Sequence, residues 1–191
     1  ETLRVGLALY TQDDTFISTI VQDLERIAQE EELARDIKIN LSVADGRSNQ
    51  TTQLEQVDRL ITWGCDVLCV NIVDRTAAAV LIDKAEEAGV PLIFFNRQPV
   101  AEDMERWDQL YYVGARAEEG GILQGQLVLK AWLSDRERLD KNGDGILQYV
   151  MLEGEPGHQD ALLRTEYSIQ VLSEAGVELE KLGSDTGNWK R

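Results

Sequence analysis

The feature that most constrains the fold is a regular alternation of short apolar runs with amphipathic segments. Four runs read as buried strands, since apolar residues continue through them without a polar face: LRVGLALY, IKINLSVAD, DVLCVNIV and PLIFFN. Helical patterns lie between them at residues 14–32, 50–63 and 75–88. Strand, helix and strand repeated at this spacing predict right-handed βαβ units and a parallel sheet covered on both faces. We therefore predict a doubly wound α/β lobe at residues 1–110.

A second and shorter series of the same kind follows. Its predicted strands are YYVGA, residues 148–153 and VELEKLGS, and its predicted helices span residues 117–133 and 160–175. Two strand–helix units do not bury both faces of a parallel sheet well. The second lobe, at residues 111–191, is therefore expected to be small or incomplete.

The charge of the chain narrows the choice of partner. It has 19 Lys and Arg residues against 35 Asp and Glu residues, a formal net charge of −16. This balance argues against nucleic acid or anionic lipid as a partner, suits a soluble monomer and favours a divalent cation. No apolar run approaches the length of a membrane span. The sequence shows no signal peptide, so we expect a cytoplasmic protein or an exported one that has already been processed.

The two cysteines, Cys65 and Cys69, lie in the predicted strand WGCDVLCVNIV. In a strand, this spacing separates their Cα atoms by roughly 13 Å, too far for a disulfide. We expect both to be small, buried, apolar side chains.

Polar side chains follow the predicted strands at their carboxyl ends, where open α/β sheets bind ligands. They occupy residues 10–16, 45–46, 71–74 and 96 in the first lobe and residues 154–160 in the second. No glycine-rich phosphate turn and no nucleophile beside a base occurs among them. The pattern favours a binding protein over a nucleotide-dependent protein or an enzyme.

The stretch DKNGDGILQ matches the front of an EF-hand calcium loop. Oxygen-bearing side chains and a glycine stand at the required positions, but the twelfth position holds Met151 where an EF-hand needs a bidentate Glu. The residues that follow read as a strand and not as a helix. The structural alternative is an ordinary Asp/Asn/Gly turn.

Several ordered segments together carry a family resemblance: RVGLALYTQDDTF, LCVNIVDRTAAAVLIDKA, VPLIFFNRQP, YYVGA and GEPGHQDALLRTEY. The sequence resembles the bacterial periplasmic galactose/glucose-binding proteins, the sugar receptors of ABC importers and of chemotaxis, over essentially its whole length. The resemblance implies the type I periplasmic-binding-protein fold, with two hinged α/β lobes that close on one aldohexose. Members of this family continue well beyond 191 residues, so it also implies that the second lobe is incomplete in this sequence.

The resemblance also implies a set of sugar-binding residues. Hydrogen bonds to the sugar would come from Asp14, Asn96, His158, Asp160 and Arg164, and Phe16 and Trp189 would sandwich the pyranose ring. These residue types suit the task, because charged partners make strong hydrogen bonds to hydroxyls and aromatic rings pack on the C–H faces of a sugar.

Each of these residues has a purely structural alternative. Asp14 can cap the helix that begins at Thr15, and Asp160 and Arg164 are spaced as a surface ion pair within a helix. His158 can be a loop residue without a role. Phe16 and Trp189 can belong to the core.

For the loop DKNGDGILQ, the resemblance implies a structural Ca²⁺ site with its last Glu supplied by a distant segment. The implied ligands are the side chains of Asp140, Asn142, Asp144 and Gln148 and the carbonyl of Ile146.

The function implied is that of a non-enzymatic receptor for D-glucose or D-galactose. Its partners would be an ABC permease and a chemoreceptor, and its location the periplasm or, as a lipoprotein, the cell surface, with the signal peptide removed. Three other interpretations stay open. The protein is a receptor for a pentose or a cyclitol, with residues 10–12 altering its specificity. Alternatively, it is a sugar-responsive regulator of the lac-repressor type without its DNA-binding domain, or it is an α/β enzyme. The chain is acidic and its first strand begins at Leu3, which disfavours the regulator.

Overall fold

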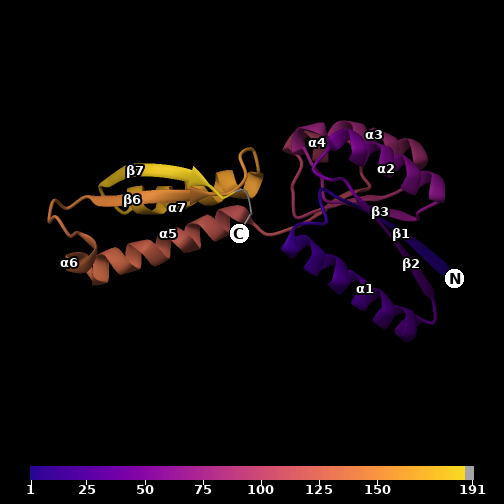
Figure 1. Cartoon of the computed structure of the whole chain (residues 1–191), viewed down its shortest axis with the longest axis horizontal. Coiled ribbons are helices and arrows are strands. Elements are labelled where there is room, and N and C mark those ends of the chain that lie inside the picture. The colour runs from indigo at the N-terminus through magenta and orange to yellow at the C-terminus, as the bar shows by residue number, and fades with distance from the viewer. Residues whose placement is uncertain (188–191) are drawn as a thin grey trace. The chain divides into compact units, whose positions relative to one another are not determined.

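The computed structural model describes residues 1–187 and divides into two compact units, Glu1–Gly114 and Ala115–Arg191 (Figure 1). Each unit is an α/β structure with parallel strands, as the alternation of strands and helices predicts. Within the described residues, no helix combines the length and the apolar character that a membrane crossing requires.

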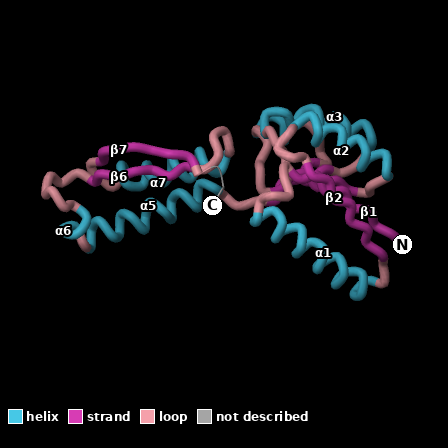
Figure 2. Tube along the Cα trace, in the orientation of Figure 1, coloured by secondary structure: helices cyan, strands magenta, loops and turns pink. Residues whose placement is uncertain are grey.

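The first unit is built around a five-stranded sheet of order β2-β1-β3-β4-β5, with every pair parallel (Figure 2). Its elements are β1 (Thr2–Leu9), α1 (Thr15–Arg35), β2 (Lys38–Asp45), α2 (Gln50–Trp63), β3 (Val67–Val70), the 3-10 helix η1 (Arg75–Ala77), α3 (Ala78–Ala88), β4 (Leu92–Phe95), α4 (Ala101–Met104) and β5 (Leu110–Val113). Helix α1 covers one face of the sheet, and α2 and α3 cover the other (Figure 1). The predicted doubly wound architecture is confirmed for this unit.

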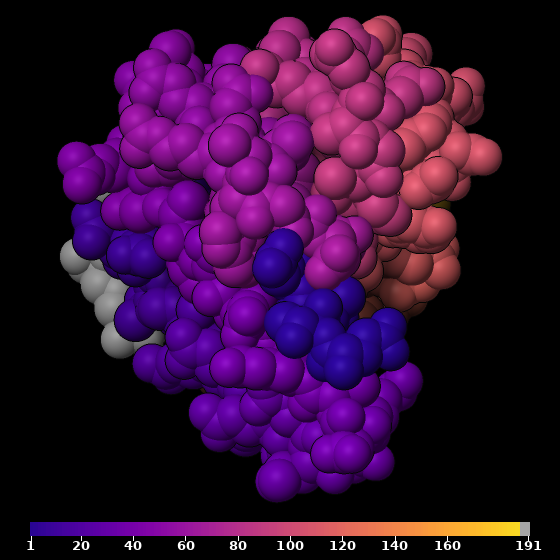
Figure 3. Space-filling view, turned by 90° about the vertical axis from the view of Figure 1, so that its right-hand side faces the viewer, coloured from indigo at the N-terminus to yellow at the C-terminus, as the bar shows by residue number. Residues whose placement is uncertain are grey.

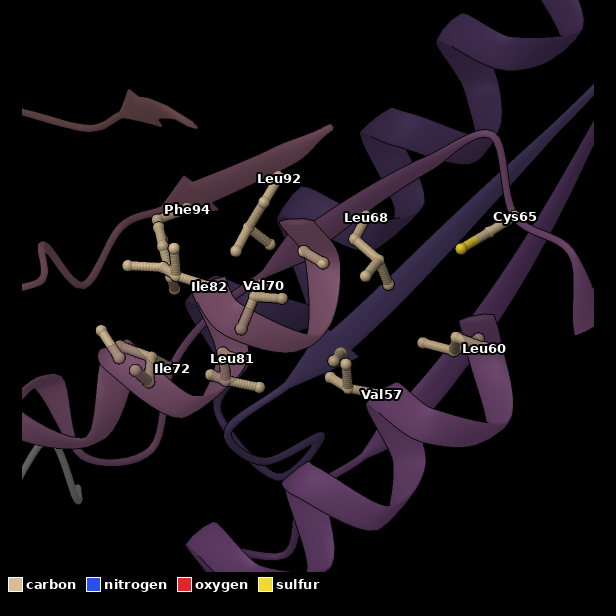
Figure 4. Close-up of a cluster of buried hydrophobic side chains, with 13 residues drawn as sticks. Val57, Leu60, Cys65, Leu68, Val70, Ile72, Leu81, Ile82, Leu92 and Phe94 are labelled. Carbon is tan, nitrogen blue, oxygen red and sulfur yellow. The ribbon is translucent and has the colours of Figure 1, made fainter. Parts of the chain in front are cut away.

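The larger part of the core lies between the sheet and helices α2 and α3. Side chains of α2 and α3 meet those of β3 and β4 there, and Leu68, Leu81, Leu92 and Phe94 are fully buried (Figure 4). A second cluster on the opposite face joins Ile17 of α1 to the end of β1. Figure 3 shows the first residues of the chain, in indigo, at the surface, and residues 2–4 of β1 are exposed.

Capping residues explain where α2 begins and ends, and the predicted range 50–63 is confirmed. The Asn49 side chain accepts a hydrogen bond from the Thr52 amide, which satisfies one of the donors that a helix leaves open at its start. Gly64 ends the helix with φ at 81°, a left-handed conformation that glycine adopts without steric cost.

The strand expected to open the second lobe belongs to the first unit. Strand β5 pairs with β4 through Leu92 and Leu110, and it forms the edge of the first sheet. The division of the chain therefore falls after Gly114, and the expected boundary at residues 110–111 cuts through a strand. The apolar pattern of YYVGA identifies a strand but not its partner.

The second unit contains α5 (Ala117–Ser134), α6 (Arg136–Leu139), β6 (Leu147–Glu153), α7 (Gln159–Glu174) and β7 (Leu179–Thr186). Strands β6 and β7 form a parallel pair, and a small core joins Trp132, Leu147 and Leu172. Helices α5 and α7 approach so closely that a Cβ added at Gly125 would lie 2.6 Å from the Ser168 carbonyl oxygen. Small residues on α5 are therefore required for this contact.

One face of the two-stranded sheet is not covered by the described residues. Val150 is 71% exposed, Leu152 81% and Leu182 61%. This agrees with the expectation that two strand–helix units leave part of a parallel sheet unburied.

Both cysteines are free thiols, as predicted. Cys65 is buried as expected, but it precedes β3 and so does not lie in the strand; Cys69 lies in β3 and is half-buried, less buried than expected. Desolvation raises the pKa of both thiols, that of Cys69 to about 11, so neither is activated as a nucleophile.

Candidate functional site

Asp14 lies where β1 gives way to α1 and caps that helix. Its Oδ1 accepts hydrogen bonds from the backbone amides of Phe16, at 2.8 Å, and Ile17, at 3.1 Å. Its Oδ2 accepts a hydrogen bond from the Tyr10 hydroxyl. The capping role considered as an alternative is therefore real, and it uses only one of the two carboxylate oxygens.

Asn96 lies at the end of β4 with φ at 63°, in the left-handed region that Asn tolerates better than most residues. Its Oδ1 accepts a hydrogen bond of 3.2 Å from Asn71 Nδ2, so the side chains that follow β3 and β4 are joined. Its carbonyl oxygen accepts a hydrogen bond of 3.1 Å from the Tyr112 hydroxyl. The polar side chains that follow β3 and β4 therefore meet at the carboxyl edge of the sheet.

Phe16 is 62% exposed, although it stands in the first turn of α1. Its neighbour Ile17 is 1% exposed and fills the core. The reading of Phe16 as a core residue is therefore wrong, and an exposed ring beside a polar sheet edge is available to pack on a ligand. Trp189, its expected partner in a sugar sandwich, lies outside the described residues.

In the second unit, His158, Asp160 and Arg164 come together at the start of α7. His158 Nδ1 accepts a hydrogen bond of 3.1 Å from the Asp160 amide and so caps the helix. An acceptor at Nδ1 places the proton of the neutral ring on Nε2, which makes Nε2 a donor. His158 is 8% exposed and Asp160 7%, so neither is an ordinary surface residue.

The ion pair between Asp160 and Arg164 joins a buried carboxylate to a more exposed guanidinium. Arg164 Nη2 lies 2.8 Å from Asp160 Oδ2, and the Arg164 side chain is 37% exposed. The reading as a plain surface ion pair is therefore wrong for Asp160. Buried charged groups of this kind are costly unless they are paired, and they are common in ligand sites.

The loop at residues 140–148 folds into a compact turn held by its own acidic side chains. Asp140 Oδ2 accepts a hydrogen bond of 2.9 Å from the Gly145 amide, and Asp144 Oδ1 accepts one of 2.9 Å from the Ile146 amide. Asn142 Nδ2 donates to Asp144 Oδ2 at 2.7 Å. Gln148 projects from β6, and its Nε2 donates to Glu180 of β7 at 2.7 Å.

One atom of this loop supports a cation site. The Asp140 side chain is 8% exposed, and its Oδ1 is buried without a hydrogen-bond partner. Residues 1–187 contain no cluster of three or more His, Cys, Asp or Glu side chains placed to hold a metal ion. The candidate donors are thus two carboxylates with amide and carbonyl oxygens, an all-oxygen set of the kind that Ca²⁺ prefers.

Two residues near the sheet edge were not identified from the sequence. Arg97 is 7% exposed, and its guanidinium stacks 3.8 Å from the centroid of the Tyr10 ring. Gln53 is fully buried on α2 and bridges β1 and β3 through hydrogen bonds to the carbonyl oxygens of Ala8, at 3.3 Å, and Asn71, at 2.9 Å. The sequence could have identified Gln53 as a buried residue, because it shares helical spacing with the buried Val57 and Leu60.

Comparison with known proteins shows which family and which sequences this chain resembles. The model of the periplasmic binding protein domain matches residues 5–191. The D-galactose/methyl-galactoside binding periplasmic protein MglB of Haemophilus influenzae is 39% identical over 186 residues, which are 97% of this chain and 54% of that protein. A putative rhizopine-binding protein of Rhizobium meliloti is 28% identical over 100% of this chain and 56% of its own. The chain thus spans about half the length of these relatives.

Solved structures share the fold. A Mycobacterium smegmatis protein in complex with β-D-fucofuranose has a TM-score of 0.78 at 24% identity, over 98% of this chain and 56% of its own. An ABC transporter solute binding protein from Bacillus halodurans C-125 with bound myo-inositol has a TM-score of 0.68 at 26% identity, over 97% and 56%. With the domain match and the Haemophilus relative, these findings identify this chain as a member of the periplasmic binding protein domain family.

Proposed function

We propose that the protein is the sugar receptor of an ABC importer and that it binds D-galactose or D-glucose. The observation that carries the proposal is that, in each unit, residues implied by the family resemblance are buried or strand-end polar groups. Asp14 and Asn96 lie at the carboxyl edge of the first sheet, and Asp160 is buried at the start of α7. The name of the Haemophilus relative supports galactose as the ligand.

The chemistry of the candidate residues suits a sugar. A hydroxyl group both donates and accepts, so the carboxylates of Asp14 and Asp160 would accept from it, while Arg164 and His158 Nε2 would donate. The exposed Phe16 ring would pack on one C–H face of the pyranose. Binding would then shift an equilibrium between open and closed forms of the protein toward the closed form. The permease and a chemoreceptor would recognise the closed form.

The same proposal places the protein outside the cytoplasm, as a periplasmic protein or a surface lipoprotein. It also includes a structural Ca²⁺, held by Asp140, Asn142, Asp144 and Gln148 and by the Ile146 carbonyl. The buried Asp140 Oδ1 supports this cation.

A second candidate ligand is a cyclitol or another polyol. A xylitol-binding protein of Mycolicibacterium smegmatis is 26% identical over 100% of this chain and 48% of its own, and one solved relative holds myo-inositol. Both ligand classes present rings or chains of hydroxyls to the same polar groups.

The test is calorimetric titration of the protein with D-galactose, D-glucose, myo-inositol and xylitol. We expect saturable one-to-one binding of one or both hexoses. Asp160→Asn should weaken binding about 10- to 100-fold, the range for hydrogen bonds to charged groups. Glu166→Gln, an exposed carboxylate on the same helix, should leave the affinity within about twofold. Heat with a polyol alone would assign the second candidate, and no heat with any of the four would contradict the proposal.

A further inference from the structure

Tyr10 is the point at which the ends of three strands are joined. Its backbone amide donates to Asn71 Oδ1 at 3.4 Å, so the end of β1 is tied to the end of β3. Its ring lies under the Arg97 guanidinium, which follows β4. Its hydroxyl donates to Asp14 Oδ2 at the start of α1. Tyr10 is only 9% exposed.

These contacts restrict the orientation of the Asp14 carboxylate. Two backbone amides, those of Phe16 and Ile17, hold Oδ1, and the Tyr10 hydroxyl holds Oδ2. With both oxygens bound, the carboxylate cannot rotate without losing a hydrogen bond. Each carboxylate oxygen accepts two hydrogen bonds, so Oδ2 keeps a position for a second donor while Tyr10 occupies the first.

Arg97 fixes the Tyr10 ring from the other side. Its Nη1 donates to the Val73 carbonyl oxygen at 3.2 Å, which anchors the guanidinium on the segment after β3. A guanidinium stacked on an aromatic ring in a buried position is a stabilising contact with a defined geometry. The ring therefore has little freedom to swing away from Asp14.

The same surroundings keep Tyr10 a donor. Burial, and then the hydrogen bond to Asp14 and the charge of that carboxylate, raise the pKa of the phenol well above its usual range, and Arg97 opposes the shift only in part. The hydroxyl thus stays protonated at neutral pH, where it donates to the Asp14 carboxylate. A protonated Tyr10 donates to Asp14 and does not repel it.

We infer that Tyr10 and Arg97 are positioning residues, which hold the Asp14 carboxylate in the orientation that receives a ligand hydroxyl. The inference rests on the proposed function, because it assigns these two residues to the same sugar site. Neither residue needs to touch the ligand. Sequence reasoning from strand ends alone does not single out Arg97, since its role depends on the fold placing it over Tyr10.

The test uses Tyr10→Phe, which removes the hydroxyl and keeps the ring under Arg97. Two measurements follow: hydrogen exchange at the amides of Phe16 and Ile17, and calorimetry with D-galactose and D-glucose. We expect both amides to exchange several-fold faster, because Asp14 loses one of its restraints. We expect sugar affinity to fall about tenfold while the thermal midpoint changes little. Tyr111→Phe, at a ring 53% exposed on β5, is the matched control and should change neither measurement.

A double-mutant cycle separates positioning from general structural support. Arg97→Met removes the guanidinium and keeps an unbranched side chain, and its effect on sugar affinity should be smaller in the Tyr10→Phe background than in the wild type. Fully additive effects would mean that Arg97 does not act through Tyr10. Should Arg97→Met fail to fold, Arg97→Lys, which keeps the charge but loses the planar group stacked on Tyr10, takes its place in the cycle.

The outcomes distinguish this inference from the proposed function. Unchanged exchange at Phe16 and Ile17 in Tyr10→Phe overturns the inference, whatever the wild type binds. Faster exchange with unchanged sugar affinity also overturns it, since Asp14 would then be ordered by Tyr10 without consequence for the ligand. A wild type that binds neither sugar contradicts the proposed function, and the ligand-positioning role falls with it.

Discussion

The Asp160 carboxylate receives a hydrogen bond of 2.8 Å from Arg164 Nη2, one turn later on α7, while only 7% of Asp160 is exposed to solvent. A carboxylate at this depth depends on its partner, because desolvation without pairing is costly.

Arg164→Met should therefore destabilise the protein. We expect a loss of about 1–2 kcal/mol in the free energy of unfolding, below the value for a fully buried pair because the Arg164 side chain is 37% exposed. Denaturant titration measures the loss. Arg138→Met breaks a pair of similar length with Asp135, 2.7 Å, in which both side chains are exposed, and should cost less than about 0.5 kcal/mol. Equal losses in the two variants would mean that the burial of Asp160 does not matter.

Gly125→Ala should destabilise the second unit even though alanine favours a helix. The added Cβ would lie 2.6 Å from the Ser168 carbonyl oxygen, so α5 and α7 must separate, at a cost of about 1–3 kcal/mol. Gly120→Ala is the control on the same helix. Its Cβ would lie 3.4 Å from the flexible Arg164 side chain, and the gain in helix propensity should make it neutral or stabilising by up to about 1 kcal/mol. A stabilised Gly125→Ala protein would refute the close packing of these helices.

Calcium should raise the thermal midpoint of the protein, and a chelator should reverse the change. The expected shift depends on Asp140, whose buried Oδ1 would gain a partner when the cation binds. Asp140→Asn should reduce or abolish the shift, and Asp135→Asn, at an exposed carboxylate nearby, should preserve it. An unchanged midpoint for the wild type across millimolar Ca²⁺ would count against the calcium proposal.

Alkaline pH should lower stability through the cysteines. The pKa of Cys69 is raised to about 11 by burial, and that of Cys65 is also raised, so the thiols ionise in the unfolded chain before they do so in the folded one. The unfolded state then binds fewer protons, and the free energy of unfolding falls as pH rises from the usual thiol pKa toward 11, by at most about 1.4 kcal/mol per unit for each thiol. Cys69→Ala should flatten this slope between about pH 8.5 and 10. A slope that the substitution does not change would assign the effect to other groups.

The face of the β6–β7 sheet that residues 1–187 leave uncovered should cause self-association at high protein concentration, contrary to the expectation of a monomer. Val150 and Leu152 together expose a wide apolar surface, and such patches associate in water. Leu152→Lys should reduce association measured by light scattering. Leu33→Lys replaces a single exposed leucine on α1, 89% exposed, and should have no effect. A monomeric wild type at all concentrations would contradict the prediction.

The sequence was sufficient for the first four strands of the first unit and the helices between them, where local signals and tertiary structure agree. Helix α2 begins and ends as predicted because Asn49 and Gly64 cap it, and its buried stripe faces the sheet. By contrast, α4 and α6 are only four residues long and leave no periodic pattern to read. The partner of β5 depends on where the chain returns in space, which an apolar run does not encode.

The candidate site was predictable in its residue types but not in its geometry. The resemblance to a known family, and not the spacing of the residues, singled out Asp14, Asn96 and Asp160. The burial of Asp160, the exposure of Phe16 and the stacking of Arg97 on Tyr10 arise only when distant segments pack together. Such contacts depend on tertiary structure, and a single sequence carries no direct signal of them.

The glycines of α5 have a mechanical consequence. Because Gly121 and Gly125 allow no side chain between the helices, α5 and α7 are expected to move as one body. Asp160 and Arg164 are carried by α7, whereas α5 begins at Ala117, three residues after the division of the chain at Gly114. A force applied at these two charged residues of α7 would therefore be passed on to α5 with little loss in side-chain motion.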